Sequence, residues 1–370
     1  MTVTVRSFAK INLGLRIGPA RPDGFHELLT VYQTIGLHDV IRVSVGRGSG
    51  RGKNKEIEIR CSDPRVPRDE SNTCFQIVAK AMPAMGATGR VVIEIEKRLP
   101  VQGGLGGASS NAVAALLGLE RALKKAWPAE EKLRIAAEVG SDLPLFLIGG
   151  TVLGVGRGEQ VYPLPDFPEV PCVVVTPEVG VSTPKAFAAW DRLCGVGTLF
   201  DKLRAGFARE EQEHSLPASS QEAAELCSAG QPGAAVPTKP EPKLTVSAAS
   251  DRINELGRGL SAWLSEPYSG APLARGRAEN PLLELVRAGI ENDFEQVVFP
   301  EYPELREGKR ALLRVGAKYA SLSGSGSALY GLFASREAAT RAAARLRKQG
   351  WSAQATMTLG RRQYWARIFR

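Results

Sequence analysis

Residues 99–117 read LPVQGGLGGASSNAVAALL, and this stretch indicates the fold more strongly than any other part of the chain. Four glycines, two serines and an asparagine fall within nine consecutive positions, and an alanine- and leucine-rich run follows. A strand-like segment precedes the stretch and a helix-like one continues it, an arrangement in which free backbone N–H groups and the positive end of a helix bind an anion. The loop alone leaves two interpretations open, a phosphate site and an ordinary glycine-rich turn.

The spelling of this loop excludes two well-known phosphate-binding motifs. The chain contains no G-x-x-x-x-G-K-[ST] sequence. Gly104 and Gly106 supply a G-x-G, but the position three beyond Gly106 is Ser109, so the dinucleotide motif fails as well. A phosphate bound here would therefore be held by another type of loop.

Length and hydropathy predict two domains. The 370 residues, 43% of them hydrophobic, suffice for two packed cores, because single cores stop growing near roughly 250–300 residues. We place these domains at residues 1–165 and 166–370. The chain has no run of ~18 apolar residues that could span a membrane, and its first ten residues have no apolar core of the signal-peptide kind. These features predict a cytoplasmic protein that does not bind membranes.

The net charge of +9 favours an anionic ligand, either a nucleic acid or a small polyphosphate. The last ten residues, RRQYWARIFR, supply four arginines, which we interpret as a solvated end. The cysteines are odd in number, scattered and without a C-x-x-C pair, which predicts reduced thiols and neither a disulfide framework nor a zinc site. These cysteines are Cys61, Cys74, Cys172, Cys194 and Cys227.

Alternating residues predict strands in the first half of the chain. In residues 10–17, KINLGLRI, the apolar side chains share one face, and Lys10, Asn12 and Arg16 share the other. Residues 90–99, RVVIEIEKRL, alternate in the manner of a half-buried antiparallel strand. A mixed α+β architecture follows from this pattern together with the helices below.

Further elements follow from periodicity and turn residues. A helix over residues 130–139 is expected to end at Gly140, and residues 150–164 read as a strand hairpin. Residues 319–333, YASLSGSGSALYGLF, predict a Gly/Ser turn that runs into a strand. An amphipathic helix is expected over residues 336–349.

Residues from about 208 to 246 are rich in Glu, Ser, Ala, Gly and Pro and nearly free of large apolar residues. This composition predicts a flexible insertion, to which we assign no function. Ordered structure is expected to return at residues 250–264, SDRINELGRGLSAWL, where Ser250 or Asp251 could cap a helix.

Pro100 followed by GGLGGASSNA resembles the phosphate loop of the small-molecule kinase superfamily named for galactokinase, homoserine kinase, mevalonate kinase and phosphomevalonate kinase. The resemblance implies an α+β fold with a ribosomal-S5-domain-2-like N-terminal domain, a ferredoxin-like C-terminal domain and an active site in the cleft between them. It also implies ATP and Mg²⁺ as cofactors. The nucleotide-binding residues that it implies are Pro100, Gly103, Gly104, Leu105, Gly106, Gly107, Ala108, Ser109, Ser110, Asn72 and Lys97.

Two details of the loop qualify this resemblance. The sequence shows no metal-binding motif, although Ser109 or Ser110 could offer a hydroxyl to phosphate or to Mg²⁺. Ala108 stands where these kinases frequently have a third glycine of a G-L-G-G-G run, so the backbone at Ala108 is expected to keep a negative φ.

Residues 7–41 are similar, nearly end to end, to the opening of one family in this superfamily, which acts on a cytidine-diphosphate sugar alcohol. The elements A-K-x-N-L and R-x-D-G-[FY]-H-x-L carry that similarity. The similarity implies ATP-dependent phosphorylation of the 2-hydroxyl of 4-diphosphocytidyl-2-C-methyl-D-erythritol, in the non-mevalonate isoprenoid pathway. It further implies a small-molecule partner without nucleic acid or membrane, and a monomer or weak homodimer.

The resemblance implies two catalytic residues, Lys10 and Asp142. Taken alone, a lysine on the polar face of a strand is most often solvated, and Asp142, directly before Leu143 and Pro144, suits a helix N-cap equally well. In the implied kinase, Asp142 orients or deprotonates the acceptor hydroxyl. Lys10 would keep that carboxylate ionised and stabilise the negative charge that develops during transfer.

The resemblance also assigns the cytidine end of the site. His26 would hydrogen-bond the edge of the cytosine, with Phe25 stacked on one face of the base and Phe187 on the other. Asn12 and Thr183 would help to hold the erythritol and cytidine portions. Taken alone, His26 could simply satisfy a turn.

The Gly/Ser turn within residues 322–333 resembles the third motif of the superfamily and would buttress the phosphate loop. Taken alone, it could be a plain tight turn.

Two other functions remain open from the sequence. A kinase of the homoserine or mevalonate type is expected to lack the R-x-D-G-F-H element, which is present here. A non-catalytic, basic RNA-binding protein of the same fold would bind RNA with steep salt dependence, but few aromatic residues lie among the basic ones in this chain.

Overall fold

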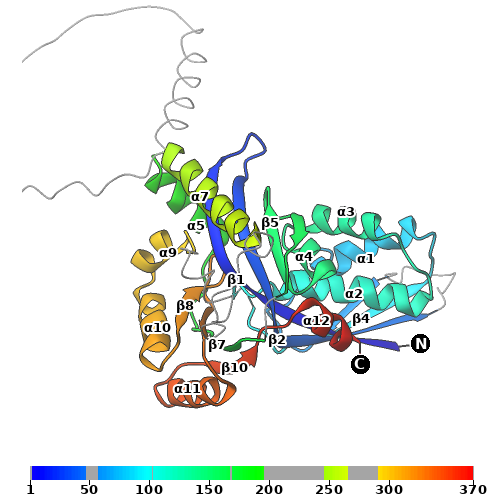
Figure 1. The fold of residues 1–370 in the computed structure, drawn as a ribbon. Helices are drawn as coiled ribbons and strands as arrows, with labels where there is room; N and C mark the ends of the chain where they lie inside the picture. Colours follow the sequence, from blue (N-terminus) through cyan, green and yellow to red (C-terminus); the bar gives the residue numbers. More distant parts are fainter. Residues whose placement is uncertain are drawn as a thin grey trace, which may run out of the picture.

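A computed structural model shows two β-sheets with helices packed against them (Figure 1). The α+β class predicted from the sequence is confirmed. The predicted insertion lies outside the described residues, apart from its last position. The structure describes residues 2–46, 57–101, 103–166, 169–195, 246–265 and 291–369.

The first sheet is built around two long antiparallel strands, β1 and β2, which pair along nearly their whole length. Strands β4 and β5 pair with two successive parts of β2, and β3 and β6 continue the sheet outward. In the described part of the chain this sheet has six strands: β1 (Thr2–Ala20), β2 (His26–Gly46), β3 (Ile57–Cys61), β4 (Arg90–Glu96), β5 (Thr151–Val155) and β6 (Gln160–Pro163).

The alternation predicted for β4 is confirmed, because Val91, Ile93 and Ile95 are buried and the residues between them are not. The strand pairs antiparallel with β2, as expected, and parallel with β3. The predicted hairpin is formed by β5 and β6.

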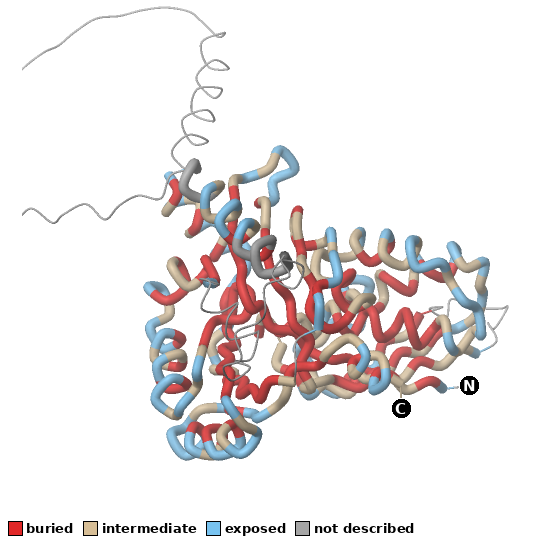
Figure 2. Tube along the Cα trace, in the orientation of Figure 1, coloured by how far each residue is buried: buried red, intermediate tan, exposed pale blue. Residues whose placement is uncertain are grey.

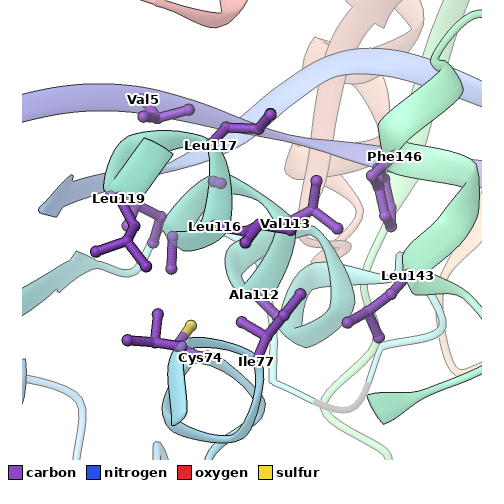
Figure 3. Packing of buried hydrophobic residues seen from close by; sticks show 14 of the residues in the cluster. Val5, Cys74, Ile77, Ala112, Val113, Leu116, Leu117, Leu119, Leu143 and Phe146 are labelled. Atoms are coloured by element: carbon purple, nitrogen blue, oxygen red, sulfur yellow. The ribbon is translucent and has the colours of Figure 1, made fainter. Parts of the chain in front are cut away.

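Helix α2 lies directly on the first sheet. Its residues from Ser110 to Leu119 are buried almost without exception, as expected for a helix that is apolar on most of its sides. Figure 3 shows α2 between β1, which carries Val5, and α1, which carries Cys74 and Ile77. The helices of this layer are α1 (Thr73–Ala84), α2 (Gly107–Leu123), α3 (Ala129–Val139) and α4 (Leu143–Ile148). The expected helix end at Gly140 is confirmed by the C-cap of α3.

The second sheet is antiparallel and has the order β10-β7-β9-β8. The expected Gly/Ser turn joins β8 to β9, and the expected amphipathic helix is α11. Its elements are β7 (Pro171–Val175), α5 (Thr183–Leu193), α9 (Glu295–Glu301), α10 (Pro303–Arg314), β8 (Tyr319–Leu322), β9 (Leu329–Leu332), α11 (Arg336–Lys348) and β10 (Ala353–Met357).

Helix α7 (Val246–Ser265) packs along β1. A side chain at Gly18 would overlap Ile253, so the glycine allows the helix to approach this strand closely. The expectation that Ser250 or Asp251 caps a helix is wrong, because both residues lie inside α7. The helix begins four residues earlier, at Val246.

The last helix, α12 (Arg361–Ile368), returns to the first sheet. Tyr364 and Ile368 are buried in its core, whereas Arg362 and Arg367 are exposed. The interpretation of this segment as a solvated end is therefore right for these two arginines and wrong for the helix as a whole.

Buried residues follow both sheets, and the exposed residues lie mainly on the outer faces of the helices (Figure 2). Strand β1 contributes to every apolar cluster, with Val5 in the first, Leu15 in the second and Leu13 in the third. The domain boundary near residue 165 stays a prediction, although the chain passes from the first sheet to the second between β6 and β7.

No helix among the described ranges is both long enough and apolar enough to cross a membrane. Four cysteines are free and buried, in agreement with the predicted reduced thiols; Cys227 lies outside the described residues. The four are Cys61, Cys74, Cys172 and Cys194.

Candidate active site

The glycine-rich loop connects β4 to α2 and is held by two glycines in the left-handed region, Gly104 (φ +71°) and Gly106 (φ +69°). At Gly104 a side chain would overlap the backbone oxygen of Ser323, and at Gly106 it would meet Phe146 and the aliphatic part of Lys10. Ala108 is not among the described residues with positive φ, as expected. No side chain caps the N-terminus of α2, so its first amides remain available to a bound anion.

The Gly/Ser turn between β8 and β9 lies against this loop. The Ser323 hydroxyl donates to the carbonyl of Gly104 (2.9 Å), and the Ala328 amide donates to the carbonyl of Gly103 (3.0 Å). These bonds join residues more than 200 positions apart, and they confirm that the turn buttresses the loop.

The loop borders a cavity of about 570 Å³ between the two sheets. Residues of the first sheet and its helices line most of the cavity, and Thr183, Phe187, Phe294, Gly324 and Ser325 of the second part close it. The cavity thus lies where the site is expected, between the two halves, and its role as the active site stays a prediction. The predicted site residues that line it are Lys10, Asn12, Phe25, His26, Asn72, Lys97, Pro100, Gly103, Gly104, Leu105, Gly106, Gly107, Ala108, Ser109, Asp142, Thr183 and Phe187.

Lys10 and Asp142 meet in this cavity. Lys10 Nζ lies 3.3 Å from Asp142 Oδ2 and donates to Asn12 Oδ1 (2.8 Å). The Lys10 side chain is only 4% exposed, so the alternative of a solvated lysine is wrong. A buried ammonium is stable only beside such acceptors.

Asp142 occupies the N-cap position of α4, but its side chain makes no capping hydrogen bond. Oδ1 instead accepts from the Tyr32 hydroxyl (3.0 Å), while Oδ2 faces Lys10. The carboxylate is thus turned into the cavity and held at both oxygens.

Tyr32 is a residue that sequence reasoning missed. Burial, followed by the charge and hydrogen bond of Asp142, raises the pKa of Tyr32 well above its ordinary value of 10.0. The phenol therefore stays a proton donor to Asp142 throughout the physiological pH range. Tyr32 lies opposite the predicted site residue Asn12 in the pairing of β1 with β2, which is the one signal that could have pointed to it. No pattern in the sequence connects Tyr32 to Asp142.

Lys97 and Asp39 form an ion pair beside the glycine-rich loop, where it enters α2. Lys97 Nζ lies 2.6 Å from Asp39 Oδ2, and the other carboxylate oxygen accepts from the amides of Arg98 and Leu99 (2.7 Å each). A side chain at Gly107 would come within 3.2 Å of Lys97 Nζ, so this ammonium lies directly beside the start of α2.

The two candidate hydroxyls of the loop differ in position. Ser109 lines the cavity. The Ser110 hydroxyl donates to the carbonyl of Phe8 (2.6 Å) and lies 2.6 Å from the hydroxyl of Ser7, so it holds α2 on β1 and does not face the cavity.

Asn72 and Cys74 lie where α1 begins. The Asn72 side chain accepts from the Cys74 amide (2.8 Å) and donates to the carbonyl of Pro67 (2.6 Å), so it shapes the cavity wall through the N-cap of α1. Burial raises the pKa of the Cys74 thiol to about 12. This thiol therefore supplies no thiolate nucleophile to the cavity.

The opposite end of the cavity holds an aromatic and a basic group in contact. His26 Nε2 lies 2.7 Å from Asp191 Oδ1, and the His26 ring stacks on Phe187 (centroids 4.8 Å apart, 13° between planes). Phe25 is 49% exposed, and the Arg157 guanidinium lies over its ring at 4.7 Å. One face of Phe187 is therefore covered by His26, and the expected stacking of Phe187 on a base would need its other face.

Thr183 is the first residue of α5, and its hydroxyl lies 2.7 Å from that of Ser325. The Asn12 side chain, besides accepting from Lys10, donates to the hydroxyl of Thr30 (2.8 Å). Both residues line the cavity from opposite halves of the molecule.

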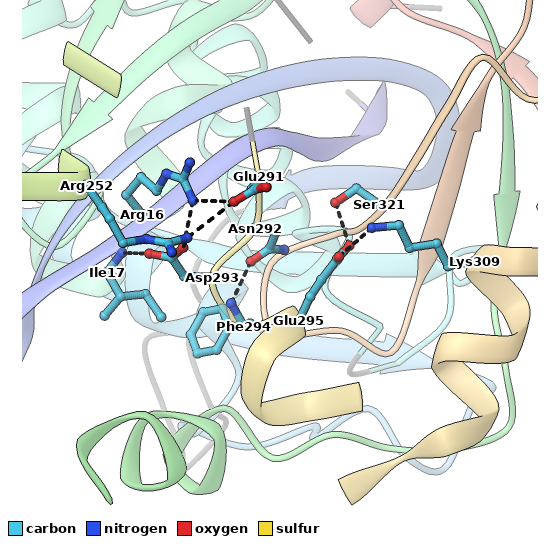
Figure 4. A network of polar contacts seen from close by, with 10 residues as sticks. All are labelled: Arg16, Ile17, Arg252, Glu291, Asn292, Asp293, Phe294, Glu295, Lys309 and Ser321. Carbon is cyan, nitrogen blue, oxygen red and sulfur yellow. Dashed lines mark hydrogen bonds and ion pairs between the residues drawn. The ribbon is translucent and has the colours of Figure 1, made fainter. Parts of the chain in front are cut away.

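The rings of His26, Phe187 and Phe294 form an aromatic wall of the cavity. A polar network behind this wall joins the two halves of the molecule (Figure 4). Buried Asp293 accepts from Arg16 (2.9 Å), from the amide of Ile17 (2.9 Å) and from Arg252 of α7. The segment that carries Asp293 also forms a parallel bridge with β1. Both guanidinium groups converge on one carboxylate that no solvent reaches.

The two neighbours of Asp293 act on the cavity itself. Asn292 donates to the carbonyls of Leu322 (2.9 Å) and Gly324 (2.8 Å) in the Gly/Ser turn. Phe294 packs edge-on against Phe187 (5.0 Å between centroids). Sequence reasoning missed this segment, because its residues carry no motif.

Comparison with known proteins agrees with this architecture. Residues 72–150 match the GHMP kinases N terminal domain, and residues 274–351 match the GHMP kinases C terminal. Fold, loop and cleft thus define a kinase of the GHMP class.

The chain is 33% identical to the 4-diphosphocytidyl-2-C-methyl-D-erythritol kinase of Solibacter usitatus, over 91% of this chain and 83% of that protein. It is 30% identical to the enzyme of that name from Desulfitobacterium hafniense, over 97% of both chains. A crystal structure of 4-(cytidine 5'-diphospho)-2C-methyl-D-erythritol kinase superposes with a TM-score of 0.61 at 26% identity, over 96% of this chain and 99% of that one. The chain belongs to the 4-diphosphocytidyl-2-C-methyl-D-erythritol kinase family of the GHMP kinases.

Proposed function

We propose that this protein transfers the terminal phosphoryl group of ATP to the 2-hydroxyl of 4-diphosphocytidyl-2-C-methyl-D-erythritol. The observation that carries the proposal is the buried Lys10–Asp142 pair beside a phosphate-binding loop, in a cavity whose other end presents His26. The names of the relatives supply the acceptor.

Asp142 accepts the proton of the acceptor hydroxyl as that oxygen attacks the phosphorus atom of the transferred group. Among the described residues each carboxylate oxygen has one partner, Tyr32 or Lys10, and keeps acceptor capacity for a further hydrogen bond. Lys10 stabilises the negative charge on the reacting oxygens, and its burial strengthens this effect because water does not screen it. The ADP oxygen leaves as the new O–P bond forms.

The phosphates of ATP lie on the amides at the start of α2 and beside Lys97. The chemistry of the available donors fits Mg²⁺ held mainly by the nucleotide, because the cavity offers the Ser109 hydroxyl and the Asp142 carboxylate as oxygen ligands. Among the described residues no group of three His, Cys, Asp or Glu side chains could hold a metal alone. When bound, the ion neutralises charge on the phosphates.

His26 gives the cavity its preference for cytosine. A neutral imidazole that donates from Nε2 to Asp191 leaves Nδ1 as an acceptor, which complements the exocyclic amine of cytosine. Phe25 covers the base, while Asn12 and Thr183 hold the rest of the acceptor. The cytoplasmic location and the monomeric or weakly dimeric state expected from the sequence stay predictions.

The test is ATP consumption by the purified protein with Mg²⁺ and three acceptors in parallel: the cytidine substrate, homoserine and mevalonate. We expect turnover with the cytidine substrate alone, and a loss of about 100-fold or more in Asp142→Asn. Preference for another acceptor would refute the roles of Phe25, His26 and Phe187, and no turnover with any acceptor would refute the kinase assignment.

A further inference from the structure

A second, smaller hollow of about 210 Å³ lies on the first sheet, and the proposed function makes no use of it. Successive residues of a strand face opposite sides. Ser7 of β1 and its partner Asp39 of β2 face α2 and the phosphate loop. Arg6 and His38 therefore face the opposite side of the sheet, where this hollow lies. Its lining residues are Arg6, Phe8, Gly36, His38, Val40, Arg98 and Arg367.

The hollow carries an excess of positive charge. No carboxylate is among its described lining residues. Glu96 is shared by Arg98 and Arg42, and Glu169 is shared by Arg367 and Arg336. Arg6 donates to a backbone carbonyl and forms no ion pair within the described ranges. Each glutamate thus neutralises only one of the two arginines beside it, and the charge of Arg6 is uncompensated.

The basic groups are held in place before any ligand arrives. Arg6 Nη1 donates to the carbonyl of Arg367 (3.0 Å), and two nitrogens of Arg98 are bound to Glu96, which leaves Nη1 available. His38 packs on Phe8 (5.2 Å between centroids), and its Nδ1 lies 2.9 Å from the carbonyl of Gly36. Guanidinium groups arranged ahead of binding favour phosphate, because fewer rotamers are lost when the ligand binds.

We propose that this hollow is a binding site for a small, multiply charged phosphate anion, separate from the phosphate loop and on the other side of the sheet. Its volume admits one phosphate or diphosphate group. Arg6, Arg98 and Arg367 supply the donors, and His38 adds a further donor when it is protonated.

Proton binding by His38 should be coupled to the anion. Burial lowers the pKa of His38, Arg98 and Arg6 lower it further, and the Gly36 carbonyl and Asp39 raise it. The charged groups that line the hollow together with His38 are Arg6 of β1, Arg98 after β4 and Arg367 of α12, whereas Asp39 of β2 acts on His38 from the other side of the sheet. An anion in the hollow offsets the repulsion by the arginines, so it raises the pKa of His38. By linkage, the anion then binds more tightly as the pH falls through this titration.

The experiment follows the imidazole protons of the full-length protein by NMR during titration with inorganic pyrophosphate at constant ionic strength. The chain contains three histidines, so the His38 signal can be assigned by comparison with His38→Gln. His26 reports separately on pyrophosphate that binds in the active-site cavity. We expect a saturable shift of the His38 signal with a Kd near or below ~1 mM, about threefold tighter at pH 6 than at pH 8.

Two variants distinguish a site from a diffuse effect of charge. Arg6→Ala should abolish the His38 response while the His26 response remains. Arg362→Ala removes an exposed arginine of α12 that does not line the hollow, and it should leave the His38 response unchanged. Equal losses in both variants, a response that does not saturate, or a response that persists in Arg6→Ala would each overturn the proposal.

Discussion

Replacing Tyr32 by Phe tests whether the contact between Tyr32 and Asp142 positions the catalytic carboxylate. The change removes one hydroxyl and leaves the ring, which is buried at 2% exposure beside the site. The lost bond is 3.0 Å long and joins a phenol to a carboxylate. Hydrogen bonds to charged groups contribute about 1.5–3 kcal/mol, and a loss of this size in the transition state lowers kcat about 10- to 100-fold.

The assay is coupled ADP release with each substrate varied in turn. Because Tyr32 acts through Asp142 and does not contact the nucleotide loop, we expect kcat to fall while KM for ATP changes less than about twofold. Tyr162→Phe is the matched control, since Tyr162 is 53% exposed and does not line the cavity.

A double-mutant cycle separates positioning from general damage. In an Asp142→Asn background the Tyr32 hydroxyl no longer has a carboxylate to hold, so Tyr32→Phe should cost little further activity. Full additivity of the two changes, or a wild-type kcat in Tyr32→Phe alone, would refute the reasoning.

Three further predictions follow from contacts and titrations described above. Gly104→Ala should lower kcat/KM for ATP by about tenfold or more, because the new methyl would overlap the Ser323 backbone at a residue with positive φ. The control is Gly350→Ala, at φ +87° with open space around it, which should leave kcat/KM for ATP unchanged. Arg252→Ala should raise KM for the cytidine substrate about fivefold without changing KM for ATP, because Arg252 binds Asp293 in the segment that supports the aromatic wall. The control is Arg258→Ala, which changes an exposed arginine of the same helix. An equal rise of this KM in Arg258→Ala would contradict the prediction. The free energy of unfolding, measured by urea titration, should fall above about pH 10 by up to ~1.4 kcal/mol per pH unit for each tyrosine whose pKa is raised in the native state, because the unfolded chain then loses phenol protons that the native state retains. A flat profile from pH 10 to 11 would contradict this for the buried Tyr32, Tyr330 and Tyr364 and the partly buried Tyr319.

Local elements were predictable from the sequence where one physical cause dominates. The glycines of the loop, the alternation of β4 and the helix end at Gly140 each follow from backbone sterics or from burial of one face. The start of α7 was missed, because Ser250 and Asp251 inside the helix suit a cap by residue type. Packing along β1 and the close approach at Gly18 support this helix instead.

The environment of β1 shows a second limit of pattern reasoning. Lys10, Asn12 and Arg16 read as a polar face, and all three are buried. Alternation tells which residues share a face but not what covers it. Here the cover includes Gly324 and the segment around Asp293, which come from the far end of the chain.

Assignment of the site depended on resemblance more than on spacing. Asp142 lies 132 positions after Lys10, and its local spelling suits a helix cap as well as a catalytic base. Only the fold shows that the carboxylate leaves the cap free and turns to Lys10 and Tyr32. The role of Tyr32 depends on this contact, so no local pattern could have indicated it.

The way β1 passes through all three apolar clusters has a consequence for biosynthesis. This strand leaves the ribosome long before two of its covering partners, α12 and the segment around Asn292, which come much later in the chain. A nascent chain therefore carries an incompletely covered apolar strand during most of its elongation. Folding of this strand is then completed only after those later segments have emerged, and chaperones that shield emerging chains should matter more for this protein than for one whose halves close independently.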